Sequence, residues 1–305
     1  MCPWSLSCFW CLWSLKNAMT FSTDGGALQR LIEAALLEDV GMGDVTSEAV
    51  FPEDQHAAAA FLCKETGVIA GLEVAAMVMA FCDPDVVFRL LCPDGSDVRN
   101  GDVAASAHGS VRGLLKAERT ALNLLQRMSG IATLTRQYVN AVRGTRARIT
   151  DTRKTVPGLR LLDKWAVRLG GGVNHRFGLD DMVLIKDNHI AAAGSLTAAV
   201  SRCRTFLVER RLQLKVEVET RTLDEVREAL RCEGINRIML DNFALDAMRE
   251  AVALIGGRVE VEASGGITLP SVRDVAGTGV DVISVGALTH SVKALDISLE
   301  LSAHA

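Results

Sequence analysis

Side chains that could take part in chemistry follow six short apolar segments in the second half of the chain. They are bases, acids, hydroxyls and glycines, and they occupy residues 151–154, 186–189, 219, 241–242, 264–266 and 284–286. Capping of a following helix would explain any one group taken alone. Six groups after six segments are hard to explain by capping, so the pattern indicates one shared active site.

Basic residues in these groups could hold several carboxylates or phosphates. The candidates are Arg153, Lys154, Arg176 and Lys186, with His175 and His189 beside them in the sequence. Arginine offers a bidentate fork to an anion and lysine a point charge. Solvated surface charge would explain an isolated base. Lys186, however, directly follows an apolar run, which favours an enclosed and functional side chain, whereas either histidine could equally be a satisfied core group.

Two carboxylates follow different apolar segments, Glu219 and Asp241. Such oxygens suit Mg²⁺, which commonly takes one or two carboxylates together with substrate phosphates. They could also bind ribose hydroxyls. Glu217 shares a strand face with Glu219, so one of the two is a candidate for an inner structural layer, and Glu219 is expected to act because it is nearer the strand end.

Small residues follow the last two segments, Ser264-Gly265-Gly266 and Ser284-Val285-Gly286. Glycine lets the backbone approach a phosphate closely, and α/β barrels commonly hold phosphate at their last two strands. Either motif alone could be an ordinary turn. Together, at these places, they predict a phosphate site.

The apolar segments themselves are predicted to be strands of one parallel sheet. They cover residues 146–150, 182–186, 214–219, 235–241, 259–264 and 280–286, and helical patterns separate most of them. Thr222 and Glu225 form a capping box at the start of one such helix. Alternating strands and helices indicate a parallel sheet with crossover connections. Without a G-x-G-x-x-G motif after the first strand, we expect an incomplete α/β barrel whose site lies at the carboxyl ends of the strands.

The preceding part of the chain is predicted to form a small α+β domain. We expect a helix over 27–37, strands over 57–71 and 86–92 around a helix over 71–81, and a hairpin turn at 100–102 leading into a strand over 103–112. From about residue 115 the pattern is helical, with a break at Ser129-Gly130.

Composition limits the possible partners. The 305 residues are 49% hydrophobic and 23% charged with a net charge of −4, which argues against a general nucleic-acid binder and makes any anion site local. No run of ~20 apolar residues predicts a membrane span. The later cysteines lie singly, without metal-ligand spacing, which favours reduced thiols in a cytoplasmic protein.

The first residues do not share the pattern of the rest. Residues 1–15 hold three of the four Trp and three of the eight Cys, including the C-x-x-C pair Cys8 and Cys11. No second such pair follows, so a redox or zinc role is the weaker interpretation. We expect residues 1–18 to be a spurious or disordered leader, with Met19 as the true start.

Several motifs resemble one enzyme family. The stretch 152–190 (TRKTVPGLRLLDKWAVRLGGGVNHRFGLDDMVLIKDNHI), together with ERTALNLLQRMSGIAT (118–133), IMLDNF (238–243) and EASGGI (262–267), closely resembles the quinolinate phosphoribosyltransferases, also called nicotinate-nucleotide pyrophosphorylases. The likeness runs from about residue 24 to the end of the chain. The long first stretch is highly specific, whereas SGG alone would not be.

The resemblance implies a fold, an activity and an assembly. The fold is the type II phosphoribosyltransferase fold, an N-terminal α+β sandwich domain (19–122), an incomplete TIM-like barrel of six or seven strands (123–289), and a tail (290–305) that returns to the first domain. The activity converts quinolinate and phosphoribosyl pyrophosphate to nicotinate mononucleotide, pyrophosphate and CO₂ in NAD biosynthesis. The assembly is a homodimer with shared active sites, or a higher oligomer.

The resemblance also implies residue roles. Quinolinate would be held by Arg119 of the neighbouring subunit and by Thr152, Arg153, His175, Arg176, Lys186 and His189. The pyrophosphate and ribose would meet Lys154, Lys186, Glu219 and Asp241, with substrate-bound Mg²⁺ at the two carboxylates. The 5′-phosphate would lie against Ser264, Gly265, Gly266, Ser284, Val285 and Gly286.

Three other functions fit parts of this pattern. Lys186 ends a strand as the nucleophile of a Schiff-base lyase can. A non-catalytic phosphate-binding paralogue would not need Glu219 and Asp241 together. The paralogue associated with molybdate transport is closer, but the intact 152–190 stretch, with its VNHR motif, favours quinolinate.

Overall fold

The computed structural model describes residues 25–302 and divides into two compact units. The first extends to Ser129 and includes the C-terminal segment from Ala294, and the second is Gly130–Lys293. The predicted leader, with Cys8, Cys11 and Met19, lies outside the described residues. Within residues 25–302, no helix is long and apolar enough to cross a membrane.

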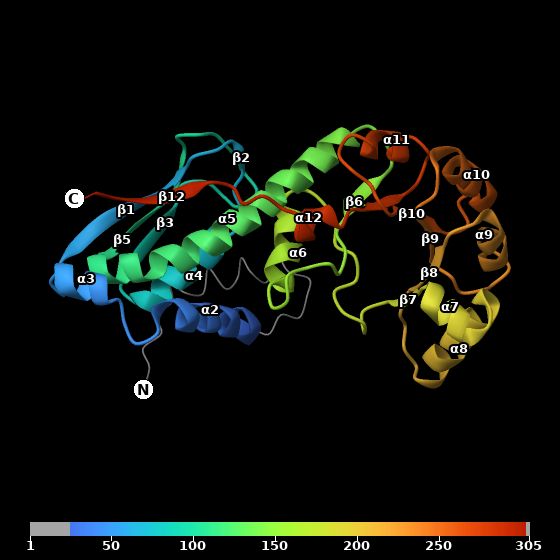
Figure 1. The fold of residues 1–305 in the computed structure, drawn as a ribbon, viewed down its shortest axis with the longest axis horizontal. Helices are drawn as coiled ribbons and strands as arrows, with labels where there is room; N and C mark the ends of the chain where they lie inside the picture. The colour runs from blue at the N-terminus through green and yellow to red at the C-terminus, as the bar shows by residue number, and fades with distance from the viewer. Residues whose placement is uncertain (1–24, 303–305) are drawn as a thin grey trace. The chain divides into compact units, whose positions relative to one another are not determined.

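The first unit contains a four-stranded antiparallel sheet in the order β12-β1-β5-β3. Its strands are β12 (Ile297–Ser302), β1 (His56–Cys63), β5 (Val103–Ser110) and β3 (Val87–Leu90), and a separate pair joins β2 (Gly67–Val68) to β4 (Asp97–Val98). Alternate residues of β1 are buried, as the period of a half-covered strand requires. The helices are α2 (Gly25–Val40), α3 (Val45–Val50), α4 (Leu72–Cys82) and the first part of α5 (Val111–Ala141), and Figure 1 shows α4 and α5 beside the sheet.

Two strand predictions for this unit are wrong. The predicted strand over 57–71 is divided, because β1 ends at Cys63 and β2 joins the other sheet. A turn forms at Asn100-Gly101, where Gly101 has a φ of +94°, but it does not make a hairpin. β4 pairs with β2 whereas β5 pairs with β1 and β3, so the turn carries the chain from one sheet to the other.

The predicted helix break at Ser129-Gly130 is also wrong, because α5 continues without interruption from Val111 to Ala141. Ser129 is fully buried, and its hydroxyl accepts a hydrogen bond from Ala70 N (2.9 Å) and donates one to Ala70 O (3.2 Å). These contacts occupy the hydroxyl that could otherwise compete with the helix backbone. Tertiary contacts therefore override the local signal for a break.

The division between the units falls within α5, after Ser129, whereas the predicted domain boundary follows residue 122. Met128 is fully buried, and a Cβ on Gly71 would lie 2.8 Å from its sulfur. Gln126 donates to Ile297 O (2.7 Å) and its carbonyl accepts from Leu295 N (3.0 Å). The C-terminal segment therefore packs in the first unit, where β12 pairs with β1, and it joins from Ala294 rather than from residue 290.

Asp94 caps α4 from a distant loop and gives this unit a testable pH response. Its Oδ1 accepts hydrogen bonds from Gly71 N (2.9 Å) and Leu72 N (3.0 Å). Burial raises the pKa of Asp94 to about 6, against the opposing effect of these bonds. An unfolded chain has an Asp pKa of about 4, so the folded state binds more protons between about pH 4 and 6 and its stability falls as pH rises through that window.

We expect Asp94→Asn to keep the acceptor at the helix terminus and to abolish this pH dependence. Asp94→Ala also removes the titrating group, but it lacks the cap as well, so it should be about 1 kcal/mol less stable than Asp94→Asn at both pH values. Urea unfolding at pH 4.5 and pH 7.5, followed for the full chain, measures both effects. An unchanged pH slope in Asp94→Asn would show that another group is responsible.

The second unit is a six-stranded parallel sheet in the order β6-β11-β10-β9-β8-β7. The strands are β6 (Arg148–Thr150), β7 (Val183–Ile185), β8 (Val216–Thr220), β9 (Arg237–Asp241), β10 (Glu260–Ser264) and β11 (Val282–Ser284). All five strand pairings are parallel, and a further parallel bridge joins Thr150 to Val173. β6 and β7 stand at the two ends of this sheet, so the barrel is incomplete, and the predicted fold class is confirmed.

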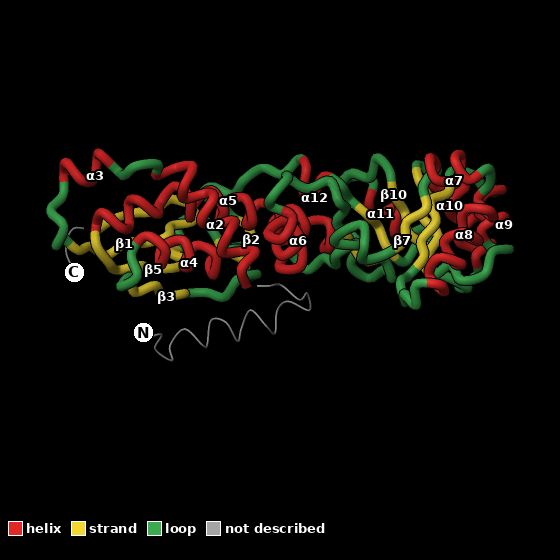
Figure 2. Tube along the Cα trace, turned by 90° about the horizontal axis from the view of Figure 1, so that it is seen from below, coloured by secondary structure: helices red, strands yellow, loops and turns green. Residues whose placement is uncertain are grey.

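Helices connect these strands as parallel crossovers require. They are α6 (Arg160–Leu169), α7 (Asp187–Ala193), α8 (Leu196–Glu209), α9 (Leu223–Ala229), α10 (Leu245–Ile255) and α11 (Val272–Ala276), and α12 (Ala287–His290) follows the last strand, β11. Figures 1 and 2 show α8, α9 and α10 on the outer side of the strands. The predicted capping box of Thr222 and Glu225 is present at the start of α9. With the helices outside, the strand ends are left to form a rim.

Candidate active site

A cavity of about 610 Å³ lies at the carboxyl ends of the strands, within the second unit. It collects most of the predicted barrel residues, and its lining is Thr152, Arg153, Lys154, His175, Arg176, Leu184, Lys186, Glu219, Met239, Asp241, Asn242, Glu262, Ser264, Gly265, Gly266 and Ser284. Arg119 belongs to the first unit. His189, Val285 and Gly286 do not line this cavity, although a Cβ on Gly286 would lie 3.2 Å from Lys154 Cδ.

Two arginines give the cavity a strongly positive side. Arg176 Nη1 donates to Met182 O (3.0 Å), and burial together with the nearby charge of Arg153 lowers the pKa of Arg176. Arg153 Nε is buried and makes no hydrogen bond with the described residues. Two neighbouring guanidinium groups repel each other, so binding of a dianion between them would be strongly favoured.

Lys186 connects the positive side of the cavity to the acidic side. Its Nζ lies 2.5 Å from Glu219 Oε2, and Glu219 is 7% exposed. Lys186 is also the N-cap residue of α7, where its backbone N–H donates to His189 Nδ1 (2.9 Å). His189 thus helps to cap the helix, and it lines a separate small cavity outside β7. The structure brings Lys186 into the rim cavity and leaves His189 out of its lining.

The acidic side is formed at the ends of two neighbouring strands. Glu219 lies in β8 opposite Met239 of β9, and β9 ends at Asp241. Arg221 approaches both carboxylates, with Nη2 3.9 Å from Glu219 Oε1 and Nε 3.6 Å from Asp241 Oδ2. The sequence interpretation did not include Arg221. Its position two residues after Glu219, just beyond the strand, was the available signal.

The glycine motif after β10 is required by close packing. Gly265 has a φ of +93°, and a Cβ there would lie 2.3 Å from Asn242 Oδ1. Any larger residue at this position would strain the backbone and displace the side chain of Asn242, which follows β9. Ser264 and Gly266 line the cavity beside Gly265, and the buried Ser284 lies at the end of the adjacent strand. Glycines in such a turn allow an anion to approach the backbone closely.

A buried charge cluster lies at the floor of this cavity. His175 Nε2 is 3.1 Å from Glu217 Oε2 and 3.5 Å from Glu262 Oε2, while Arg237 Nη1 is 2.7 Å from Glu262 Oε2. Both glutamates are fully buried, which makes Glu217 the inner-layer residue of its strand. The three ligand atoms of His175, Glu217 and Glu262 are close enough to hold a metal ion, but Arg237 already supplies positive charge there. Ion pairs hold the cluster together, although His175 Nε2, both oxygens of Glu217 and Glu262 Oε1 have no hydrogen-bond partner among the described residues.

Both ring nitrogens of His175 face protein groups. Nδ1 accepts a hydrogen bond from Arg176 N (2.8 Å), so in this geometry the ring proton is on Nε2, between the carboxylates. Burial lowers the pKa of His175, but Glu217 and Glu262 outweigh it and raise the pKa to about 9. The raised pKa favours a second proton on the ring, but that proton would have to enter at Nδ1, where Arg176 N–H already donates, so the hydrogen bond favours the singly protonated form. His175 therefore fixes the backbone of Arg176, in addition to lining the cavity.

A buried ion pair between Lys164 and Asp151 holds the loop that contains residues 174–176. Lys164 Nζ donates to Asp151 Oδ1 and to His175 O (3.0 Å). The Asp151 carboxylate also accepts from Asn174 Nδ2 (2.5 Å) and His175 N (2.9 Å). Lys164 is 2% exposed and Asp151 is fully buried. This pair holds residues 174–176 next to β6, and the sequence interpretation gave Lys164 no role.

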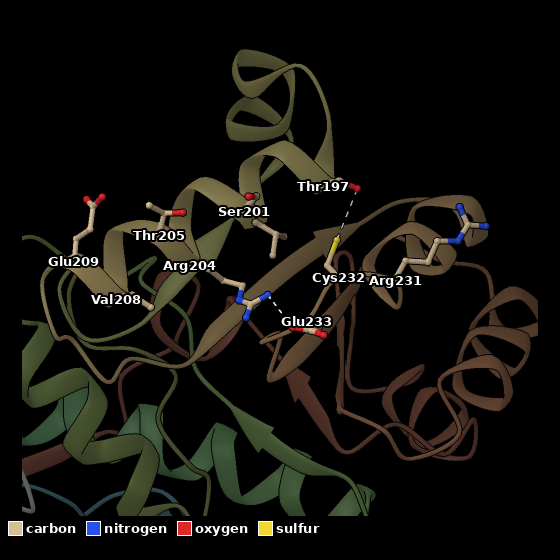
Figure 3. Close-up of a pocket in the computed structure, with 10 residues that line it drawn as sticks. Thr197, Ser201, Arg204, Thr205, Val208, Glu209, Arg231, Cys232 and Glu233 are labelled. Carbon is tan, nitrogen blue, oxygen red and sulfur yellow. Dashed lines mark hydrogen bonds and ion pairs between the residues drawn. The ribbon is translucent and has the colours of Figure 1, made fainter.

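A second cavity, of about 590 Å³, lies outside the barrel between α8 and the segment after α9 (Figure 3). Arg204 Nη1 is paired with Glu233 Oε2 (3.3 Å), and Cys232 Sγ lies 3.8 Å from Thr197 Oγ1. Its arginines and glutamates do not form a concentration of one charge. The rim cavity is therefore the better candidate for chemistry.

The fold and the rim cavity define a class of barrel enzyme that binds polyanionic substrates. Known proteins specify the class further. Residues 44–129 match the N-terminal domain, and residues 131–300 the C-terminal domain, of the quinolinate phosphoribosyl transferase family. The chain belongs to the quinolinate phosphoribosyltransferase family.

Individual relatives agree with this assignment. The chain is 48% identical over 289 residues to the mitochondrial quinolinate phosphoribosyltransferase (decarboxylating) 2 of Nicotiana glauca, with 90% of this chain and 82% of that protein covered. It is 45% identical over 275 residues to the probable nicotinate-nucleotide pyrophosphorylase (carboxylating) of Bacillus subtilis, covering 90% and 93%. The crystal structure of NadC from Streptococcus pyogenes is similar with a TM-score of 0.87 and 41% identity, covering 93% of this chain and 99% of that one.

Proposed function

We propose that this protein is a decarboxylating quinolinate phosphoribosyltransferase of NAD biosynthesis. It would convert quinolinate and 5-phosphoribosyl 1-pyrophosphate to nicotinate mononucleotide, pyrophosphate and CO₂. The observation that carries the proposal is the division of one rim cavity into a cationic side, an acidic side and a glycine turn. Each part suits one portion of the two substrates.

The cationic side would bind quinolinate. Arg153 and Arg176 can each form a bidentate contact with a carboxylate, and Thr152 lines the same wall. This would aim the pyridine nitrogen at the sugar carbon. Loss of the 2-carboxylate leaves its electron pair on the ring carbon, which then takes a proton, and the positive ring nitrogen stabilises the charge. Positioning would supply much of the rate.

The lysines would act on the departing pyrophosphate. As the bond from the sugar carbon to the pyrophosphate oxygen breaks and the bond to the pyridine nitrogen forms, negative charge grows on that oxygen. Lys154 and Lys186 line the cavity and can stabilise it electrostatically. The turns at Ser264–Gly266 and Ser284–Gly286 would bind the 5′-phosphate.

Glu219 and Asp241 fit a site for Mg²⁺. They offer hard carboxylate oxygens on adjacent strands, and both already face positive groups, Lys186 and Arg221. When bound with the substrate, the ion would neutralise pyrophosphate charge. The two carboxylates would hold it or bind the ribose hydroxyls.

One assay tests the activity. The full chain is incubated with quinolinate, with and without phosphoribosyl pyrophosphate, and pyrophosphate and CO₂ release are measured. Release of both products only when both substrates are present is expected. Absence of both under conditions where the protein is folded would reject the proposal and favour the paralogue associated with molybdate transport. A Schiff-base lyase needs a free amine, whereas Lys186 Nζ is paired with Glu219, and borohydride trapping with a carbonyl substrate tests it.

We propose further that the enzyme is a homodimer, or a higher oligomer built from such dimers, in which Arg119 enters the partner's site. The side chain of Arg119 is 59% exposed, and its Nη2 lies 3.9 Å from Glu118 Oε1. Mixing inactive Arg119→Ala with inactive Lys186→Ala should restore activity, because a mixed dimer has one site with both residues. Equal mixtures contain half mixed dimers, so recovery should reach about a quarter of wild type if sites act independently.

The matched control mixes Arg153→Ala with Lys186→Ala. Both residues belong to the barrel rim, so every site in this mixture keeps one defect and no recovery is expected. Subunit exchange is verified with two affinity tags. No recovery in the Arg119 mixture despite proven exchange would place Arg119 in its own chain's site or outside the site.

The cellular location is also a proposal. The five cysteines in the described residues are free, and burial raises the pKa of the Cys63 thiol to about 11. Reduced thiols suit the cytoplasm, and we propose that location, with no nucleic-acid or membrane partner.

A further inference from the structure

Arg221 is the least expected charged residue at the rim. It follows β8 directly, and its side chain is 54% exposed. The guanidinium approaches carboxylates from three elements: Asp187 Oδ2 at 2.9 Å, Asp241 Oδ2 at 3.6 Å and Glu219 Oε1 at 3.9 Å. Asp187 begins α7, Glu219 lies in β8 and Asp241 ends β9. Arg221 does not itself line the rim cavity, but it borders Glu219 and Asp241, which form its acidic side, where the proposed pyrophosphate and Mg²⁺ would bind.

The two cations at these carboxylates are held differently. Lys186 Nζ lies 2.5 Å from the well-buried Glu219, at direct hydrogen-bond distance. Arg221 lies beyond 3.5 Å from both Glu219 and Asp241, and among the described residues its closer ion pair is with the half-exposed Asp187. Exposed ion pairs contribute about 0–1 kcal/mol, so little is lost when Arg221 moves away from its carboxylates. Its guanidinium is therefore available for a stronger anion.

We infer that Arg221 is a further substrate-binding residue, which binds the pyrophosphate group of the sugar substrate from the β8 side of the rim. The inference rests on the proposed function. In the free protein Arg221 partly neutralises Glu219 and Asp241. With Mg²⁺ bound beside the substrate, Glu219 and Asp241 would no longer need Arg221 as a counter-ion, and its guanidinium would turn to the phosphate oxygens, for which its planar fork is suited. Asp187 keeps the side chain near the rim during this exchange.

The experiment measures binding of inorganic pyrophosphate with Mg²⁺ by calorimetry, using the full chain. Arg221→Ala should weaken this binding by about tenfold, the size of one charge-assisted hydrogen bond, and should raise KM for phosphoribosyl pyrophosphate similarly. Quinolinate affinity, titrated separately, should not change. Arg221→Lys should recover part of the loss, because it restores the charge without the fork. The matched control is Arg227→Ala, an exposed arginine of α9 that is ion-paired to Asp224 (2.7 Å).

Two outcomes would overturn the inference. One is unchanged pyrophosphate binding in Arg221→Ala. The other is tighter binding of Mg²⁺ alone without weaker pyrophosphate binding, which would make Arg221 only a counter-ion of the carboxylates. Wild-type activity separates these outcomes from failure of the proposed function. In one result, wild type releases CO₂ in the presence of both substrates and Arg221→Ala does so with an unaltered KM for phosphoribosyl pyrophosphate. That result would support the proposed function and contradict the role of Arg221.

Discussion

Lys164→Met should destabilise the barrel unit by about 3–5 kcal/mol, the usual cost of removing one partner of a buried ion pair. The substitution leaves the carboxylate of Asp151 buried and without its counter-ion. Burial already raises the pKa of Asp151 and lowers that of Lys164, so each group depends on the other for its charge. Residues 174–176 would lose their support from Lys164, and with it the fixed position of Arg176.

Denaturant unfolding of the full chain at pH 7 measures this loss. Arg168→Met is the matched control, because Arg168 lies on the same helix but is exposed, and an effect within about 0.5 kcal/mol is expected. The double variant Asp151→Asn with Lys164→Met should be less destabilised than the sum of the single variants, because no unpaired charge remains. A loss below about 1 kcal/mol for Lys164→Met alone would contradict the assigned role.

The rim could be predicted from the sequence because its signals are local. A parallel strand fixes which end carries its last residue, so Glu219 and Asp241 had to lie at the same edge once both strands were recognised. The same reasoning placed Arg153, Lys186 and Gly265 in one cavity. The family motifs of residues 152–190 added the substrate, which strand periodicity alone does not specify.

The errors arise where distant contacts decide the structure. Ser129 looks like a helix break until its hydroxyl is seen bonded to Ala70, 59 residues away. The turn at Gly101 is correct locally, but strand partners are chosen by the sheets, not by the turn. His175 and His189 could not be separated by sequence. His175 contacts a buried pair of carboxylates, and His189 caps a helix. These roles depend on how other strands and helices pack around each histidine.

Lys164 and Arg221 show a second reason why some roles could not be predicted from the sequence. Each looks like an ordinary surface base in the sequence, and the partner that gives it a role comes from another element. Lys164 is buried where it meets Asp151, which follows β6 and is fully buried, and where it donates to His175 O. Periodicity can assign a charged side chain to one face of a helix. Whether that side chain is buried depends on which elements pack against the face.

Loss of turnover without loss of quinolinate binding is the expected result of Glu219→Ala and of Asp241→Ala. Each should lower kcat by about 10²–10³-fold, as removal of one electrostatic contact to a transition state commonly does. Glu219→Gln keeps the shape and an acceptor for Lys186 but removes the charge, so a similar loss there would assign the effect to electrostatics.

The charges around the rim predict whether quinolinate affinity falls or rises in Glu219→Ala. Glu219 Oε2 holds Lys186 at 2.5 Å, so its removal leaves Lys186 free beside the cationic wall of Arg153 and Arg176. The net positive charge facing quinolinate then rises, and quinolinate affinity should stay the same or increase. Calorimetry with quinolinate alone, beside kcat at saturating substrates, separates the two effects.

Glu233→Gln is the control, since Glu233 is also paired with an arginine but lies at the outer cavity, so neither kcat nor quinolinate affinity should change (Figure 3). Equal losses of turnover and quinolinate affinity in Glu219→Ala would move this carboxylate to the quinolinate side of the site.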